Sequence, residues 1–187
     1  QYGMDKGVVG GYFIWLKSAL SGNWGDSWVW TVPVTQEFHD TVWYSFALGL
    51  VAFIFEIIIA IPLGITAAKK QYSFTDYFTT VVSMICISMP TFFVATILKY
   101  IFSVKLGWFD LSGMQGRNYI NLSEFGKMLD IAKHFVLPSI TLIIISIGGL
   151  MRYTRTNMLE VLNADYIRTA RAKGVPEKKV INYHAFR

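Results

Sequence analysis

The sequence is poor in charge and contains a single cysteine. Charged residues make up 16% of the chain against 53% hydrophobic residues, and the apolar residues come in long runs, which is typical of a membrane protein. The lone Cys86 excludes an internal disulfide and a cysteine-based metal cluster, and its place in an apolar run favours inert packing. No string matches G-x-x-x-x-G-K-S/T, H-E-x-x-H or G-x-S-x-G. Neither a P-loop ATPase nor the hydrolases that carry the other two motifs are therefore indicated.

Histidines are also scarce, and none is well placed for catalysis. His39, His134 and His184 lie at or beyond the ends of the apolar runs, so no base stands beside a nucleophile within them. An intramembrane enzyme that uses Glu56 or Cys86 is the alternative from another class, and no catalytic or metal-binding residue is predicted. The chain begins without an initiator methionine or signal peptide and ends in mid-helix, so we expect an internal part of a longer protein.

Three apolar runs predict an all-α protein, a polytopic bundle of transmembrane helices. A helix over residues 41–68 is about 42 Å long, which is enough to cross about 30 Å of hydrocarbon with some tilt. Residues 76–102 and 135–152 form the second and third predicted spans. The remaining segments are predicted to be an outer loop with a short amphipathic helix (residues 1–40), a second outer loop (residues 103–134) and a cytoplasmic loop (residues 156–187).

Polar residues within the first two spans are candidates for a pathway or for contacts between helices. Glu56 shares a helical face with small residues, and such a face packs on other helices because small residues permit close approach. We expect Glu56 either to line a pathway or to be a protonated or hydrogen-bonded packing residue. Pro90 predicts a kink in the second span, where Ser83 or Ser88 can satisfy the freed backbone groups. Lys99, near the outer end of that span, is expected to snorkel to the headgroups.

The distribution of charge predicts the orientation. From Met151 onward there are eight basic residues against three acidic ones, and the first forty residues hold two basic and four acidic residues. Segments rich in Lys and Arg stay on the cytoplasmic side, so the C-terminal segment is expected to be cytoplasmic and the N-terminal segment outside. A basic anchor for nucleic acid is disfavoured, because the charges are interleaved with a capped pair of short helices.

The stretch NADYIRTARAKGVPEKKV predicts that pair of helices. Asp165 is expected to be the N-cap of a first helix over residues 166–173, and Gly174 to take the left-handed position that ends it. Pro176 fits the first turn of the second helix, and Glu177 complements its dipole.

One face of the first helix is expected to contact a partner. Tyr166, Ala170 and Lys173 share this face at i, i+4 and i+7, and it is narrow enough to enter a groove of another protein.

The string DYIRTARAKG (residues 165–174) resembles the cytoplasmic EAA loop of ABC importer permeases, in the version carried by the dipeptide/oligopeptide (and nickel) permease family. The general pattern is Glu-Ala-Ala, three residues, then Gly. Arg168, Thr169, Ala170 and Gly174 occupy these positions here, so the Glu and the first Ala are replaced. The strings ISMPTFF and VKLGWFDLSG resemble two further parts of the family, with aspartate where proline is usual in the second, and the likeness covers nearly the whole chain.

The resemblance implies a type I ABC importer permease in which this loop is the coupling helix that docks in a cleft of the ATPase subunit. The residues carried over to that role are Asp165, Tyr166, Arg168, Ala170, Arg171, Lys173 and Gly174. The implied partners are a homologous permease subunit, two ATPase subunits that bind ATP and Mg, an extracytoplasmic substrate-binding protein and the lipid of the inner membrane. No cofactor is expected in this chain. Short peptides are the implied cargo, with nickel or another small solute as the alternative.

Overall fold

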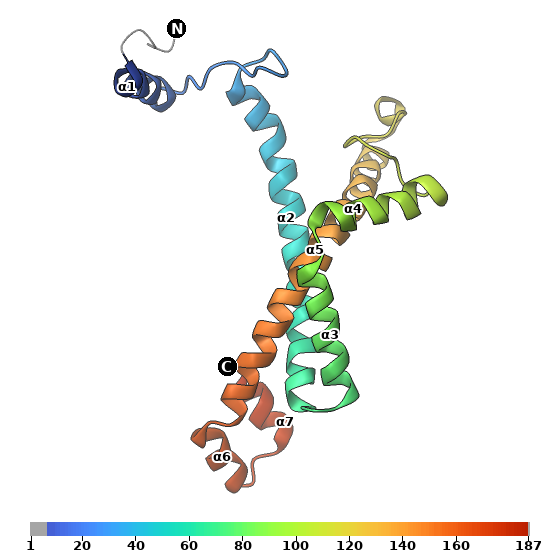
Figure 1. Ribbon diagram of the computed structural model, residues 1–187. Coiled ribbons are helices and arrows are strands. Elements are labelled where there is room, and N and C mark those ends of the chain that lie inside the picture. The colour runs from blue at the N-terminus through green and yellow to red at the C-terminus, as the bar shows by residue number, and fades with distance from the viewer. Residues whose placement is uncertain (1–6, 187) are drawn as a thin grey trace. The chain divides into compact units, whose positions relative to one another are not determined.

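The computed structural model describes residues 7–186, whose secondary structure is helical apart from one isolated bridge between Asp26 and Pro33. The chain divides into two units at Ala47. α1 (Gly7–Leu20) and the first part of α2 (Val34–Lys69) belong to the first unit, and the rest of α2 and all later helices belong to the second (Figure 1). The all-α prediction is confirmed for the described part. The first six residues and Arg187, which the predicted terminal loops include, lie outside it.

α2 is longer than the predicted first span. It begins at Val34, so residues 34–40, predicted as loop, are helical, and an acidic residue in the first turn complements the helix dipole. The small-residue face is buried as expected in the second unit, at Ala60, Gly64 and Ala68. A Cβ atom added at Gly64 would lie 2.7 Å from Cβ of Thr154, so only glycine allows α2 to approach α5 this closely.

The predicted second span is broken in two. α3 (Phe74–Ser88) and the pair α4 (Thr91–Lys99) and η2 (Tyr100–Lys105) meet at an angle of 98°, which is a sharper change than the expected kink. The cause is local, because the residue before a proline is pushed out of the helical region, and Met89 is extended with ψ 129°. Pro90 is the N-cap of α4. Because Pro90 has no N–H, the backbone carbonyl four residues earlier, that of Cys86, is the group left without its helical partner. Neither expected hydroxyl bonds it, since Ser88 Oγ donates to the Met84 carbonyl and Ser83 Oγ to the Thr80 carbonyl.

α5 (Glu124–Leu162) extends the predicted third span at both ends. Residues 124–134, predicted as outer loop, form its first turns, and residues 156–162, assigned to the cytoplasmic loop, form its last. The missed signal at the start is an N-cap, since Ser123 Oγ accepts a hydrogen bond from the Gly126 N–H at 3.2 Å. Polar composition alone was therefore a poor guide to a loop here. Between η2 and α5 lies a short 3₁₀ turn, η3 (Tyr119–Asn121).

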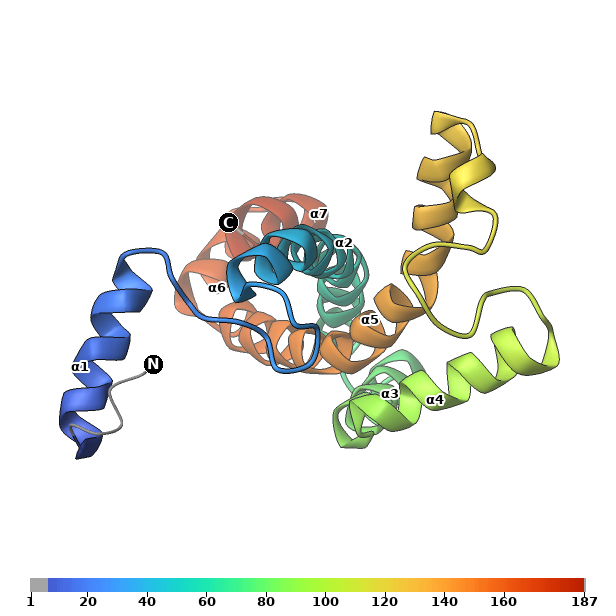
Figure 2. The same cartoon turned by 90° about the horizontal axis from the view of Figure 1, so that it is seen from above.

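α3 and α5 lie side by side in both views of the second unit (Figures 1 and 2). A Cβ atom added at Gly148 of α5 would lie 2.6 Å from the Ser83 carbonyl oxygen and 2.9 Å from Cβ of Cys86, so the contact requires glycine. By length and hydropathy α2 and α5 can each cross a membrane, whereas α3 with α4–η2 qualifies only if the bent pair counts as one span. The described residues therefore contain the three predicted spans only if α3 and α4–η2 together cross the membrane once.

Candidate functional site

The site lies in the C-terminal hairpin, which consists of α6 (Asp165–Ala172), α7 (Glu177–Lys179) and η4 (Val180–Ala185). Gly174 has φ +76°, as expected for the left-handed residue that ends the first helix. The predicted N-cap is wrong, because Ala164 occupies that position without a side-chain hydrogen bond. Asp165 is instead the first helical residue, and its side chain is 99% exposed. Pro176 is the N-cap of α7, so it lies just before the helix and not in its first turn as predicted.

A small apolar core holds the hairpin together. Ile167, Ala170 and Val180 are buried against one another, and partly buried Val161, Val175 and Ala185 pack around them. The predicted partner face of Tyr166, Ala170 and Lys173 is therefore wrong at its centre, because Ala170 is only 9% exposed. The larger apolar neighbours decide which side of α6 turns inward, and Ala170 follows them.

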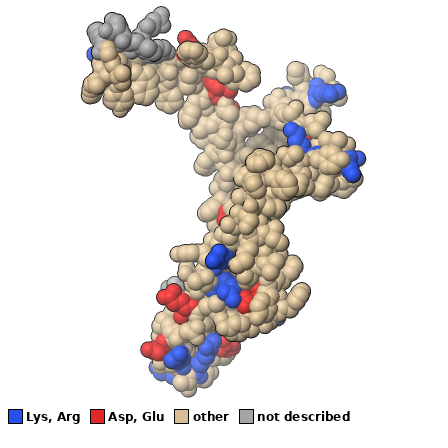
Figure 3. All heavy atoms as spheres, viewed as in Figure 1, with Lys and Arg blue, Asp and Glu red and all other residues tan. Residues whose placement is uncertain are grey.

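The exposed side of α6 carries polar, charged and aromatic groups. Its members are Asp165, Tyr166, Arg168, Thr169 and Arg171. We call these five residues the α6 outer face. Tyr166 is 55% exposed and the Arg168 side chain 69% exposed, and Lys173 is exposed just beyond. Figure 3 shows charged side chains of both signs gathered at the α6–α7 end of the second unit. Tyr and Arg are the residue types that most often anchor protein interfaces, so this face is suited to docking.

A second apolar cluster fixes the hairpin to the long helices. Ile181 of η4 is buried together with Ala68 of α2 and Met158 of α5. Ile65 and Leu159, with Leu162 and Ala185, pack against the same cluster. A displacement of the hairpin would therefore be transmitted to the ends of both α2 and α5, since well-packed contacts resist independent movement.

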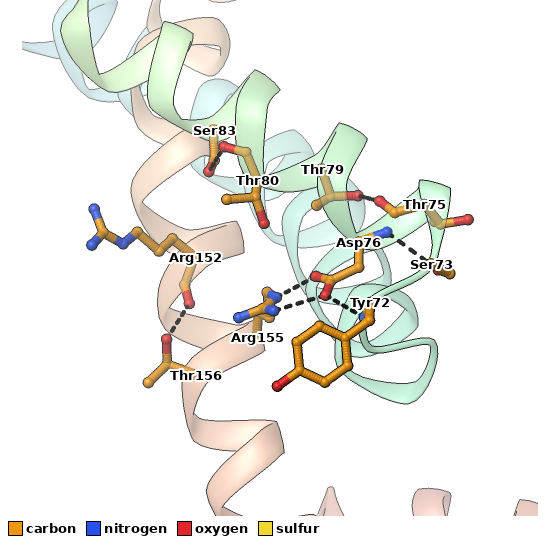
Figure 4. A network of polar contacts seen from close by, with 10 residues as sticks. All are labelled: Tyr72, Ser73, Thr75, Asp76, Thr79, Thr80, Ser83, Arg152, Arg155 and Thr156. Carbon is orange, nitrogen blue, oxygen red and sulfur yellow. Dashed lines mark hydrogen bonds and ion pairs between the residues drawn. The ribbon is translucent and has the colours of Figure 1, made fainter.

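A buried ion pair ties α3 to α5 near the same end (Figure 4). Asp76, in the first turn of α3, has a side chain only 4% exposed. Arg155 donates to it from both Nε and Nη2, the second bond at 2.8 Å. The Asp76 carboxylate also accepts a hydrogen bond from the Tyr72 N–H at 3.0 Å, and Ser73 caps the start of α3. Tyr72 has φ +62°, a conformation uncommon for a non-glycine residue, and this bond helps to hold it.

The Asp76–Arg155 pair was not predicted from the sequence, although a signal was present. Both residues fall at the same end of predicted spans and carry opposite charges, and a charge near hydrocarbon requires a partner. An arginine at the end of a span is expected from the sequence alone to snorkel to the headgroups, and that expectation gives Arg155 no protein partner. The bidentate geometry indicates that its main contact is the carboxylate.

The other predicted positions are placed more simply. Glu56 is partly buried on the same face of α2 as buried Ala52 and Ala60. None of the hydrogen bonds or ion pairs within residues 7–186 uses its carboxylate, so a pathway role and a packing role both stay open. Ser88 is the last residue of α3 and Pro90 is the N-cap of α4, so both lie at the break between these two helices.

Arg171 and Glu177 join the two arms of the hairpin across its turn. Arg171 Nη2 donates to Glu177 Oε1 at 2.7 Å, and its Nε donates to Oε2 at 3.1 Å. These hydrogen bonds lower the pKa of Glu177 below its ordinary value and raise that of Arg171. Both side chains are exposed, so the contribution to stability is small.

The pH dependence of the hairpin follows from the sign of the Glu177 shift. A carboxyl whose pKa is lowered on folding stabilises the fold above its unfolded pKa, about 4.3, and this contribution is lost as the pH falls through the lower folded value. Amide hydrogen exchange of the hairpin should therefore be slower in the wild type than in Glu177→Gln at neutral pH, and the two should converge in acid, once the Glu177 carboxyl is protonated in the folded state as well. Glu160→Gln, at an exposed position on α5, is the control. A difference that persists in acid would contradict this role of the pair.

Helices that are long and apolar enough to cross a membrane, with a charged hairpin at one end, define a membrane-embedded component. The chain matches the family described as "Binding-protein-dependent transport system inner membrane component" over residues 60–187, and it belongs to that family.

The chain is 39% identical to the oligopeptide transport system permease protein AppB of Bacillus subtilis, over all of this chain and 58% of that protein. A putative peptide permease protein of Brucella ovis is 36% identical over all of this chain and 57% of its own length. The dipeptide transport system permease protein DppB of Alkalihalophilus pseudofirmus is 33% identical over 94% of the chain and 57% of its own length. The chain thus spans less than three-fifths of these relatives.

Proposed function

We propose that this chain is part of the permease subunit of an ATP-driven importer of short peptides. The observation that carries the proposal is the C-terminal hairpin, whose apolar core presents the α6 outer face to solvent and whose second cluster joins it to α2 and α5. A separate ATPase that binds ATP and Mg docks on that face, and its movement reaches the membrane helices through Ile181. The similarity to oligopeptide and dipeptide permeases supports peptides as the cargo.

The assembly that this function needs includes other subunits. A homologous permease completes the pathway, two ATPase subunits supply the energy, and an extracytoplasmic binding protein delivers the peptide. The chain itself is a transport subunit with no reaction of its own. In the proposed orientation the C-terminal hairpin is cytoplasmic and the N-terminal unit lies outside the inner membrane, because basic residues concentrate in the hairpin.

Cysteine labelling tests the orientation. In a Cys86→Ala background, Val29→Cys and Gln115→Cys should react with a membrane-impermeant reagent on intact cells, and Lys70→Cys and Lys178→Cys only after lysis. All four positions are exposed, so accessibility within the protein does not limit the reaction. Labelling of the Lys178 position in intact cells would reverse the orientation.

Uptake measurements test the cargo. Cells that lack the transporter should regain uptake of radiolabelled dipeptide when the complete transporter genes are restored, and ⁶³Ni uptake should be unchanged. The control is the same transporter with an inactive ATPase, which should import neither. Restored nickel uptake without peptide uptake would refute the peptide assignment while keeping the importer class.

A further inference from the structure

The end of the second unit away from the C-terminal hairpin contains a cavity of about 330 Å³ between α4, the segment after η2 and α5. This cavity is far from the C-terminal hairpin, because His134 at the cavity and Asn163 at the end of α5 are separated by on the order of 40 Å of helix. The volume is at the lower end of the range for small-molecule sites. Apolar side chains such as Leu137 and Leu142 form much of the wall, and four ionisable groups also line it, namely Lys99, Asp110, Lys133 and His134.

His134 presents an unsatisfied nitrogen at this cavity. Its side chain is only 5% exposed. Nδ1 lies 2.7 Å from the Asp130 backbone carbonyl, and because a carbonyl only accepts, Nδ1 carries the hydrogen. Nε2 is buried and makes no hydrogen bond with any of residues 7–186, although Asp110 Oδ2 lies 3.3 Å away. In the neutral ring Nε2 is an acceptor, so two acceptors stand side by side and require a donor.

The surrounding contacts hold this pair of acceptors in place. The backbone of Asp110 is fixed because its carbonyl accepts a hydrogen bond from the buried Ser103 hydroxyl at 3.3 Å. The carboxylate of Asp130 lies 3.7 Å from His134 Nδ1 but is engaged elsewhere, since it accepts the Gly116 N–H at 2.7 Å. Asp110 is therefore the carboxylate that is available to a ligand, and the site is preorganised.

We infer that this cavity binds a dipeptide-sized zwitterion. Its ammonium group donates to Asp110 Oδ2 and His134 Nε2, and its carboxylate group pairs with Lys99 and Lys133. The termini of an extended dipeptide are about 7 Å apart, which matches the dimensions of a cavity of this volume. This inference rests on the proposed peptide import and adds to it a subsite in the permease, separate from the binding protein.

Equilibrium binding of tritiated Ala-Ala to the purified whole transporter, without binding protein and nucleotide, tests the inference. The wild type should bind saturably, and acetylation of the amino terminus or amidation of the carboxyl terminus should each weaken binding about tenfold or more, because each removes a charge-assisted contact. Asp110→Asn should weaken Ala-Ala to a similar extent and leave the affinity for N-acetyl-Ala-Ala unchanged. The double variant Lys99→Met/Lys133→Met should likewise weaken the binding of Ala-Ala and leave the affinity for Ala-Ala amide unchanged. Lys127→Met, on the first turns of α5 and outside the cavity lining, is the control.

Three outcomes would overturn the subsite. The first is the absence of saturable binding to the wild type, and the second is an equal loss of affinity for Ala-Ala and for N-acetyl-Ala-Ala in Asp110→Asn. The third is that the wild type binds Ala-Ala and N-acetyl-Ala-Ala equally well. That third result is expected if a charged His134 pairs permanently with Asp110. Uptake of Ala-Ala by cells is measured in parallel. Uptake without binding to the cavity refutes the subsite alone, whereas variant-sensitive binding without uptake supports the subsite and refutes peptide import.

Discussion

Removing one partner of the Asp76–Arg155 pair should destabilise the second unit by on the order of 3 kcal/mol. Asp76 is almost fully buried, so Arg155→Met would leave a desolvated carboxylate without its counter-charge, and only the Tyr72 N–H would remain to bond it. A quarter of the Arg155 side chain is exposed, which places the cost at the low end of the range for buried pairs. The measurement is the melting temperature of the purified protein in detergent.

Two comparison variants make this test specific. Arg152→Met removes an exposed arginine from the same helix, and Figure 4 shows that side chain directed away from Asp76, so the melting temperature should change little. The double replacement Asp76→Leu/Arg155→Met should be less damaging than Arg155→Met alone, because no unpaired charge stays buried. If all three variants melt like the wild type, the ion pair is not structural.

Features that depend on local backbone preference or helical period could be predicted from the sequence. Gly174 has the positive φ that a helix-ending glycine suggests, and the stripe of Ala60, Gly64 and Ala68 faces another helix as its spacing requires. Pro90 was recognised, but its effect was underestimated, since the restriction on Met89 ends the helix instead of bending it.

Features that depend on tertiary contacts could not be predicted in this way. Asp76 and Arg155 are 79 residues apart, and nothing local pairs them. Ala170 was placed on the docking face because spacing alone does not say which side of a short helix is inward. That choice is made by the packing of Ile167 on Val180 from the other arm of the hairpin. Its consequence is that bulk at Ala170 would disrupt the hairpin core and would not report on docking.

Docking is better tested on the α6 outer face. Tyr166 and Arg168 are exposed and absent from both apolar clusters, so their removal should leave the hairpin folded. As anchors of an interface each should contribute on the order of 2 kcal/mol, or about thirtyfold in the Kd of the ATPase.

Gly174→Val acts differently, because a Cβ there has nothing within 4 Å but φ is +76°. It should strain the hairpin turn by about 1–3 kcal/mol.

The most direct measurement is copurification of the ATPase subunit with the permease at equal membrane levels of permease. The wild type and Arg152→Ala, which removes an exposed arginine outside the hairpin, should retain the ATPase. Tyr166→Ala/Arg168→Ala should lose it, together with dipeptide uptake. Retention of the ATPase and of uptake by this double variant, or failure of the wild type to bind any ATPase, would contradict the assignment of the C-terminal hairpin as the coupling element.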